Sequence, residues 1–497
     1  MVRFLKYLLA TLIVVMLAAW VFWPREWVVR GPVLDFLTGG QIKPPAEVAL
    51  GSHFTLPEGF SMGIFATVEH PRVMKFTAAG DMIVSSLRPG KIFLVRGDKD
   101  GDGRSDGQRL LLEGLQAPHG VALRDGYLYV AETGRVTRHA FDAIAGVITG
   151  PREIILDELP SDDGHRTRTI EFGPDGMLYL TVGSSCNVCI EKHPYRAAML
   201  RMAPDGSDAR LFATGLRNSV GFDWQPSTGR LYATDNGRDL LGDDTPNCEL
   251  NMVDDGQDYG WPYAFDNRIA DPDFGPDNPG KVSASTGMVH GFGGHRAPLG
   301  IRFLRPGLEP AGYEGAALVA LHGSWNRSVL AGYKVVSLHF GADGSVRQQD
   351  FLSGFEKDGD VSGRPADVIQ GPDGAIYVAD DYAGSIYKIA AAGQVVANDT
   401  ISERPKQNGL ERIGATARVA LQTEGAALFT AKGCAACHAI LPGQAQPAAR
   451  ALKGLGSRFT LGGIRDLLTT PPATMPKIAL SEDEKKALAV YLLSEYP

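Results

Sequence analysis

Residues 371–379 read GPDGAIYVA, and residues 173–180 read GPDGMLYL. In both stretches a Pro-Asp-Gly turn leads into a short run of apolar and aromatic residues, which is typical of a turn followed by a buried β-strand. Shorter versions of the pattern occur at residues 80–85, 125–131, 229–234 and 317–321. The repetition indicates that the chain is built from copies of one β-rich unit.

Aligned on their strands, near positions 83, 128, 178, 231, 318 and 376, the copies recur about every fifty residues, the length of a four-stranded propeller blade. One interval is longer. Its excess, residues 235–298, is expected to form loops over one end of the central channel, where functional loops gather. We predict an all-β, six-bladed β-propeller over residues 45–395. The alternative is a set of unrelated sandwich strands, since Asp-Gly turns also mark ordinary hairpins.

Composition agrees with a turn-rich β protein. The 497 residues include 60 Gly and 31 Pro, and only 21% are charged, which excludes a coiled coil and a disordered chain. The formal net charge is -8, and no block of Lys and Arg follows the first thirty residues. A nucleic-acid partner is therefore excluded.

The N-terminal segment, residues 7–23, carries no charge and has Thr11 as its one polar residue. Residues 1–30 are predicted to be an uncleaved transmembrane anchor, because bulky Trp20, Phe22 and Trp23 follow the small residues that a signal peptidase would need. A cleaved signal peptide is the alternative. In either case the remaining chain is expected to be exported, which in a bacterium places it on the periplasmic face of the inner membrane.

The motif most specific for one cofactor is Cys434-Ala435-Ala436-Cys437-His438. Two cysteines at this spacing, with the histidine adjacent, predict covalent attachment of haem c through Cys434 and Cys437, with His438 as an iron ligand. Met475 is the predicted sixth ligand, because it is the one methionine after His438 and Met/His ligation suits an electron acceptor. An open, His-only iron site is the alternative, and zinc is disfavoured because no further ligands are suitably spaced.

Helix signals surround this motif. Residues 425–432 predict a helix, and Ser481 with Glu484 forms a capping box for a second helix that runs to Ser494. Residues 422–497 therefore resemble a minimal all-α class I cytochrome c domain. Residues 396–421 are predicted to be the linker between this domain and the propeller.

Short polar segments interrupt the repeated strands. They are HRTRTIEFGPD at 165–175, GLRN at 215–218, DNGR at 235–238 with ELN at 249–251 and YGWP at 259–262, HGSWNR at 322–327, and RPADV at 364–368. With these segments in this order, residues 56–389 resemble the quinoprotein sugar dehydrogenases, the six-bladed family of the soluble glucose dehydrogenases dependent on pyrroloquinoline quinone (PQQ) and the L-sorbosone dehydrogenases.

The resemblance implies a role for each segment. His165 lies at the position of the general base. The residues implied to bind PQQ are Arg217, Asn218, His295, His322, Arg327 and Arg364. The carbonyls of Gly237 and Arg238 lie in the segment that holds a catalytic calcium ion. His322 stands where the glucose-oxidising members carry Lys, and Ala366 where they carry a second Arg, so glucose specificity is not implied.

These residue types also suit the chemistry on physical grounds. A planar tricarboxylate quinone is well bound by guanidinium groups, which Arg217, Arg327 and Arg364 supply from different blades. A histidine is a suitable base near neutral pH. Calcium bound to the quinone would stabilise the negative charge that develops as hydride arrives.

A second calcium site is predicted in residues 98–106, DKDGDGRSD, which have the alternating carboxylates and tight Gly turn of a calcium loop. Its candidate ligands are Asp98, Asp100, Asp102 and Asp106. No Glu closes the loop at its twelfth position, so a solvated acidic hairpin is the alternative.

Three more cysteines lie in the propeller region. Cys186 and Cys189 are expected to form a local disulfide in an oxidising compartment. Cys248 could instead pair with either of them, because connectivity does not follow from sequence.

The sequence thus predicts an exported quinohaemoprotein that oxidises a sugar, a sugar aldehyde or a polyol at PQQ. Electrons would pass to haem c and then to a membrane respiratory acceptor. Two alternatives remain: a haem electron carrier or sensor that uses its propeller as a docking platform, and a calcium-dependent lactonase-like hydrolase.

Overall fold

A computed structural model describes residues 40–46, 49–391, 413–438, 459–471 and 475–496, together with residues 32, 396, 410, 452 and 455. Contacts divide the chain into two compact units. The first ends at Ala397 and contains the β-strands, and the second includes residues 398–497 and contains the longer helices.

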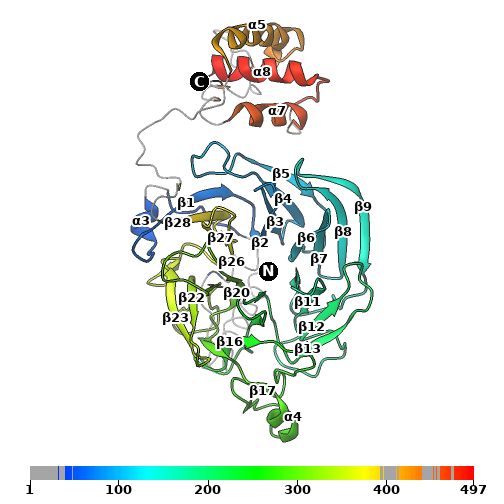
Figure 1. The fold of residues 1–497 in the computed structure, drawn as a ribbon, viewed down its shortest axis with the longest axis vertical. Helices are drawn as coiled ribbons and strands as arrows, with labels where there is room; N and C mark the ends of the chain where they lie inside the picture. The colour runs from blue at the N-terminus through cyan, green and yellow to red at the C-terminus, as the bar shows by residue number, and fades with distance from the viewer. Residues whose placement is uncertain are drawn as a thin grey trace, which may run out of the picture. The chain divides into compact units, whose positions relative to one another are not determined.

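Six four-stranded antiparallel sheets form the first unit and lie as blades around a common centre (Figure 1). The first two blades are β2 (Pro71–Phe76), β3 (Met82–Ser86), β4 (Lys91–Val95) and β5 (Gln108–Leu112), then β6 (Val121–Arg124), β7 (Tyr127–Glu132), β8 (Arg135–Asp142) and β9 (Val147–Leu156). The next two are β10 (Arg168–Phe172), β11 (Leu178–Val182), β12 (Ala198–Met202) and β13 (Arg210–Thr214), then β14 (Phe222–Trp224), β15 (Leu231–Asp235), β16 (Asn247–Met252) and β19 (His290–Gly294).

The fifth blade contains β20 (Pro298–Phe303), β21 (Ala317–Leu321), β22 (Lys334–Phe340) and β23 (Val346–Leu352). The sixth contains β26 (Pro365–Gln370), β27 (Ile376–Asp380), β28 (Ser385–Ala391) and, as its outer strand, β1 (Phe60–Thr67). The predicted six-bladed propeller is therefore confirmed.

Each copy of the repeated sequence pattern forms the second strand of a blade, namely β3, β7, β11, β15, β21 and β27. Every residue of β11, β15, β21 and β27 is buried, because neighbouring blades cover both faces of the sheet. In the Pro-Asp-Gly turns, Gly176 and Gly374 have φ of 76° and 83°, a conformation that favours glycine.

The propeller ring is closed by pairing between distant parts of the chain. β1 pairs antiparallel with β28, with Phe60 opposite Ala391 and Thr67 opposite Ser385. The short helix α3 (Leu50–His53) precedes β1, and Leu50 packs in the apolar core between the fifth and sixth blades.

The long interval between the fourth and fifth repeats is not made of loops alone. Two strands of the fourth blade, β16 and β19, lie within residues 235–298, so the prediction of loops throughout this stretch was wrong. The inserted part runs from 253 to 289 and contains β17 (Ala264–Phe265), β18 (Ile269–Ala270) and helix α4 (Pro279–Ala284). β17 and α4 project outward beyond the fourth blade (Figure 1). A further short hairpin, β24 (Glu356–Lys357) and β25 (Asp360–Val361), precedes β26.

The second unit contains α5 (Ala415–Ala431), α6 (Ala435–His438), α7 (Leu461–Thr469) and α8 (Glu482–Glu495). The helix expected at 425–432 belongs to α5, which begins at Ala415, inside the stretch assigned to the linker. The predicted capping box of Ser481 and Glu484 is present at the start of α8. α5 and α8 approach closely at Gly425, where a Cβ atom would lie 2.2 Å from the carbonyl oxygen of Ala487.

Within the described residues no helix is long and apolar enough to cross a membrane. The predicted anchor at residues 7–23 lies outside the described residues, as does most of the linker predicted at 396–421.

Candidate functional site

Polar residues gather at one end of the propeller, where the first strand of each blade begins. Arg72 lies at the start of β2, His119 just before β6, His165 before β10, Arg217 before β14 and Arg364 before β26. The second strand of each blade runs antiparallel to the first and ends at this same side. Ser184, Asp239, His322 and Asp381, which follow second strands, therefore lie at the same end of the propeller.

Two groups of these residues are linked by hydrogen bonds and charge interactions. The His165 group consists of His165, Arg217, Asp239, His295 and Asn326. The His322 group consists of Arg72, His119, His322, Arg364 and Asp381.

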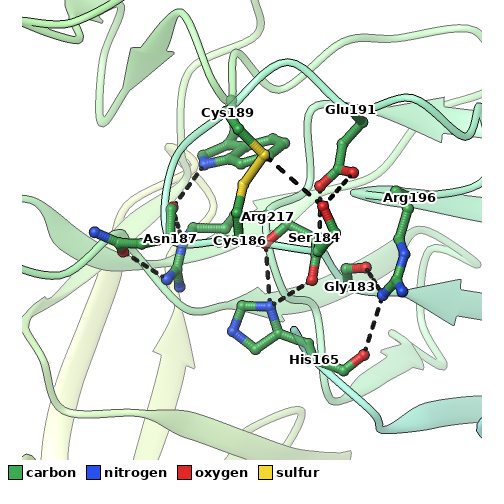
Figure 2. Close-up of a disulfide and its surroundings, with 11 residues drawn as sticks. His165, Gly183, Ser184, Cys186, Asn187, Cys189, Glu191, Arg196 and Arg217 are labelled. Carbon is green, nitrogen blue, oxygen red and sulfur yellow. Dashed lines mark hydrogen bonds between the residues drawn. A yellow bond between two sulfur atoms is a disulfide. The ribbon is translucent and has the colours of Figure 1, made fainter. Parts of the chain in front are cut away.

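His165 is held through one ring nitrogen. Its Nδ1 lies 3.1 Å from both the carbonyl oxygen and the Oγ of Ser184 (Figure 2). A carbonyl can only accept, so Nδ1 carries the proton and Nε2 keeps its lone pair. Burial and the charge of Arg217 lower the pKa of His165 to about 3. The imidazole is therefore a neutral proton acceptor at pH 7.

The guanidinium of Arg217 is surrounded by protein acceptors. Nε and Nη2 donate to the backbone oxygen and to Oδ1 of Asn187, both at 2.9 Å. Nη1 donates to the carbonyls of Asn236 and Gly237, and Nη2 also to the carboxylate of Asp239 at 3.3 Å. Each guanidinium nitrogen already donates to a protein acceptor. Arg217 therefore contributes a fixed positive charge to the site rather than hydrogen-bond donors for a ligand.

Asp239 joins the other members of the His165 group. Its Oδ1 accepts a hydrogen bond from Nδ2 of Asn326 at 3.0 Å and lies 3.6 Å from Nδ1 of His295. Burial raises the pKa of Asp239, but the neighbouring imidazole of His295 and the charge of Arg217 outweigh this effect and lower it overall. Asp239 is therefore ionised beside the imidazole of His165.

The His322 group is centred on a carboxylate. Asp381 lies 2.8 Å from Nε2 of His322 and accepts a hydrogen bond from Nη1 of Arg72 at 2.6 Å. The guanidinium of Arg364 donates to the carbonyls of His322 and Gly323. Burial raises the pKa of Asp381, but His322 and Arg72 outweigh it and keep this carboxylate ionised.

The two histidines of this group are also neutral. Burial and Arg72 lower the pKa of His119 to about 3, and burial and Arg364 lower that of His322 to about 4. Nε2 of His322 donates to Asp381, which leaves Nδ1 as the ring nitrogen with a lone pair.

Several polar atoms at this end are buried and have no hydrogen-bond partner among the described residues, and they include Nε of Arg72, Oδ1 of Asn218 and Oδ1 of Asn326. A buried polar atom without a partner costs about 1–3 kcal/mol. A polar ligand that carries both acceptors and donors would satisfy these atoms.

Several residues predicted to bind PQQ or calcium form hydrogen bonds or ion pairs with other protein groups instead. Arg327 donates to the backbone of Asp243 and Gly294 and to the carboxylate of Asp244, so its described bonds fasten the loop before β16. The guanidinium of Arg238 pairs with Asp271 and Asp273. The carbonyl of Gly237 accepts from Arg217.

The predicted calcium loop brings carboxylates together. Ligand atoms of Asp98, Asp100 and Asp102 lie within 4.8 Å of one another. The amide of Asp106 donates to the carbonyl of Gly97, and the amide of Arg104 donates to Asp102. The loop thus brings together three carboxylates, which are oxygen ligands of the kind that calcium binds.

In the helical unit, Cys434 and Met475 both pack against the core formed by residues such as Phe429, Ile464 and Leu488. His438 ends α6, and its amide donates to the carbonyl of Cys434. Two predicted haem residues that are 41 positions apart in sequence therefore pack against one apolar core.

The expected disulfide between Cys186 and Cys189 is present, and Cys248 is buried as a free thiol in β16. Sequence reasoning missed Arg72, His119, Asp239, Asn326 and Asp381. The available signal was positional, because Arg72 and His119 stand at the start of a first strand, as His165 does.

Known proteins are similar to this chain over its propeller region. A family model described as TrAA12-like matches residues 54–265 and 283–392. An uncharacterized protein of Borreliella burgdorferi is 30% identical over 360 residues, which cover 69% of this chain and 92% of that protein. A pyrroloquinoline quinone-dependent sugar dehydrogenase of Hypocrea jecorina is 23% identical over 355 residues, covering 61% and 77% of the two chains.

Solved structures share the fold. The iodide structure of the Trichoderma reesei family AA12 enzyme has a TM-score of 0.60 at 19% identity and covers 71% of this chain and 99% of its own. The PQQ domain of the pyranose dehydrogenase of Coprinopsis cinerea has a TM-score of 0.57 at 19% identity, with coverage of 68% and 96%.

Proposed function

We propose, since this chain belongs to the TrAA12-like family, that it is a PQQ-dependent dehydrogenase that oxidises a sugar, a sugar aldehyde or a polyol. The observation that carries the proposal is the convergence of neutral histidines, buried arginines and unpartnered polar atoms where the first strands of the blades begin. The relatives named for PQQ and for sugar or pyranose dehydrogenase activity support the same assignment.

His165 would remove the proton of the substrate hydroxyl. Its Nε2 has the lone pair for this step, because Nδ1 is committed to Ser184. Burial and the charge of Arg217 keep the imidazole neutral. An anionic cofactor would partly neutralise the charge of Arg217, which would raise the pKa of His165 and make it a stronger base.

The positive charges of the His322 group and of Arg217 would together hold the anionic cofactor. Arg72 and Arg364 supply positive charge for its carboxylates, with His322 beside them, and the buried Nε of Arg72 lacks a described partner. Asn218 and Asn326 would offer their unpartnered carbonyl oxygens to the hydroxyl groups of a substrate. When bound, PQQ would supply the acceptor for the hydride of the substrate.

We assign no step to calcium at Gly237, because Arg217 already donates to this carbonyl and would repel a cation there. The Asp98–Asp102 loop is the better candidate for a calcium ion, in a structural role. Calcium added to chelator-treated protein should raise its melting temperature, and Asp100→Asn should remove that increase.

In the C-terminal unit we propose haem c, attached to Cys434 and Cys437 and ligated by His438 and Met475. The shared apolar core beneath Cys434 and Met475 supports this assignment. The haem would supply a one-electron acceptor. The final acceptor would be a respiratory component of the membrane that holds the N-terminal anchor, on the oxidising side, where the Cys186–Cys189 disulfide is stable.

The test is reconstitution. The chain is expressed with c-type haem maturation, supplied with PQQ and calcium, and mixed with aldoses, sugar aldehydes and polyols while the haem spectrum is followed. We expect substrate-dependent haem reduction that requires PQQ and is lost in His165→Ala. Turnover with an artificial acceptor but without haem reduction would refute the relay and retain the dehydrogenase, and no PQQ binding would refute the dehydrogenase.

A further inference from the structure

The loop between β11 and β12 contains a small covalent ring that adjoins the His165 group. The disulfide joins Cys186 to Cys189 and so closes a ring of four residues around Asn187 (Figure 2). Both cysteines are partly exposed, so the disulfide is accessible to a reductant.

Asn187, inside the ring, contacts two residues of the His165 group. Its backbone oxygen and Oδ1 accept the two hydrogen bonds from Arg217. Its Oδ1 also accepts from the amide of Asp239 at 2.8 Å, and its Nδ2 donates to the carbonyl of Asp239 at 3.0 Å. One side chain thus fixes the backbone of Asp239 and one edge of the Arg217 guanidinium.

The other side of the ring reaches His165. Oγ of Ser184 donates to the carbonyl of Cys186 at 2.7 Å, and the same Ser184 holds Nδ1 of His165. In Figure 2 His165 reaches toward Ser184 on one side of the ring, and Arg217 reaches toward Asn187 on the other. The base and the neighbouring positive charge are therefore both attached to one disulfide-closed segment.

The disulfide is the covalent constraint on this segment. Residues 183–197 contain neither helix nor strand, so no regular hydrogen-bond ladder fixes the position of Asn187. With the ring open, residues 186–189 gain backbone freedom, and the bonds from Asn187 must then compete with water. The blades are expected to stay packed, because the ring lies in the loop between β11 and β12 and its two cysteines are partly exposed.

We propose that the Cys186–Cys189 ring is a redox-sensitive positioning element, in which Asn187 holds Arg217 and Asp239 in place while the disulfide is closed. Opening proceeds by thiol–disulfide exchange with a dithiol. The dithiol supplies two electrons and two protons, the S–S bond becomes two thiols, and the dithiol leaves as its own disulfide. The site is then complete in an oxidising compartment and loosened in a reducing one.

Hydrogen exchange of the full-length chain tests the positioning directly. The amide of Asp239, which donates to Oδ1 of Asn187, is followed in untreated protein, in dithiothreitol-treated protein and in the Cys186→Ser/Cys189→Ser variant. We expect exchange about ten-fold faster in the last two. The amide of Val378, in the fully buried β27, should be unchanged in all three and shows that the propeller remains folded.

Two controls separate the ring from other effects. Dithiothreitol should change nothing further in the double serine variant, which has no ring to open. Asn187→Ala, which keeps the disulfide, should reproduce the faster exchange of Asp239. Unchanged exchange of Asp239 after opening of the ring would overturn the proposal.

Opening of the ring should also weaken the binding of PQQ. This expectation rests on the proposed function and is measured separately, by titration with PQQ. We expect binding about ten-fold weaker when the ring is open, the usual effect of losing residues that orient a binding group. If no form of the protein binds PQQ while Asp239 responds to reduction, the proposed function fails and the positioning role stands. If PQQ binds equally well to both forms and Asp239 does not respond, the positioning role fails and the proposed function stands.

Discussion

His165 shows how one side chain is prepared for its chemistry by two different neighbours. The hydrogen bond to Ser184 determines which nitrogen carries the proton, and burial together with the charge of Arg217 keeps the imidazole neutral. The two effects are separable, because Ser184 contacts the ring directly whereas Arg217 acts through its charge.

The effect of burial and charge predicts the pKa of His165 in the presence and absence of the cofactor. In protein without cofactor, its ring should remain neutral down to about pH 4, whereas a free histidine is half protonated near pH 6.5. Addition of PQQ should raise the pKa, because carboxylates near Arg217 offset its charge. Carbon-13 histidine NMR, with His165→Asn for assignment, measures both values. A midpoint near pH 6.5 in the cofactor-free protein would contradict the argument.

Glu249 in β16 is a buried acid that affects how the stability of the fold depends on pH. Burial, with Asp235 nearby, raises its pKa to about 8. A carboxyl whose pKa is raised on folding stabilises the fold at low pH, and this contribution is lost as the pH rises from its unfolded pKa of about 4.3 towards 8.

Glu249→Gln should therefore gain stability relative to the natural chain between pH 5 and pH 8, by up to about 1.4 kcal/mol per pH unit. Urea unfolding followed by tryptophan fluorescence measures the difference at each pH. Glu113→Gln, at an exposed glutamate, is the matched control and should show no such trend. Equal pH dependence in the Glu249 variant and the natural chain would show that Glu249 is not the titrating group.

At the scale of elements, α5 and α8 illustrate packing that depends on one small residue. Gly425 lies where a Cβ would be 2.2 Å from the carbonyl oxygen of Ala487 and 2.5 Å from Cβ of Tyr491. The rings of Phe429 and Tyr491, 5.4 Å apart, pack at the same helix pair. The backbones can approach this closely because position 425 has no side chain.

Gly425→Ala should destabilise the helical unit by about 1–3 kcal/mol, although alanine ordinarily favours a helix over glycine. The loss is read from the thermal unfolding of the helical circular dichroism signal. In α7, Gly462→Ala meets no atom closer than 4.0 Å and should be neutral or slightly stabilising. Similar melting temperatures for both variants would argue against close helix packing.

The elements also show what could be predicted from local sequence. The repeated GPDG turns and alternating strands revealed all six second strands, because turn chemistry and strand alternation are local. The capping box at Ser481 was equally local. By contrast, β16 and β19 were assigned to loops, because neither follows such a turn and an insertion separates them.

The residues of the candidate site could be predicted only where they lie within a recognisable sequence motif. His165, Arg217 and His322 stood in recognisable segments, whereas Arg72 and Asp381 are brought beside His322 from opposite ends of the propeller sequence. Arg327 lay in a matching segment, yet its described bonds go to the 243–244 loop. Residue type and spacing do not specify which way a side chain points once the blades have assembled.

At the scale of the whole molecule, stability depends on closing the ring between β1 and β28. Without β1, the sixth blade would have three strands, an exposed β28 edge and an uncovered apolar core that includes Tyr387 and Ile389 of β28.

A chain that begins at residue 69 should therefore unfold at a markedly lower temperature or aggregate, whereas a chain that begins at residue 40 should retain the stability of the propeller. Thermal unfolding and light scattering of the two truncations give the comparison. An equally stable chain from residue 69 would mean that the ring does not need its first strand.

The β1–β28 pairing also determines the order of events during synthesis. Phe60 leaves the ribosome about 330 residues before its partner Ala391, and at ordinary rates of translation this interval lasts roughly 15 to 65 s. Throughout that time β1, with Phe60, Met62 and Phe65, has no strand to pair with. Holding chaperones should therefore associate with this first strand more than with any later one, and they should release it when the sixth blade emerges.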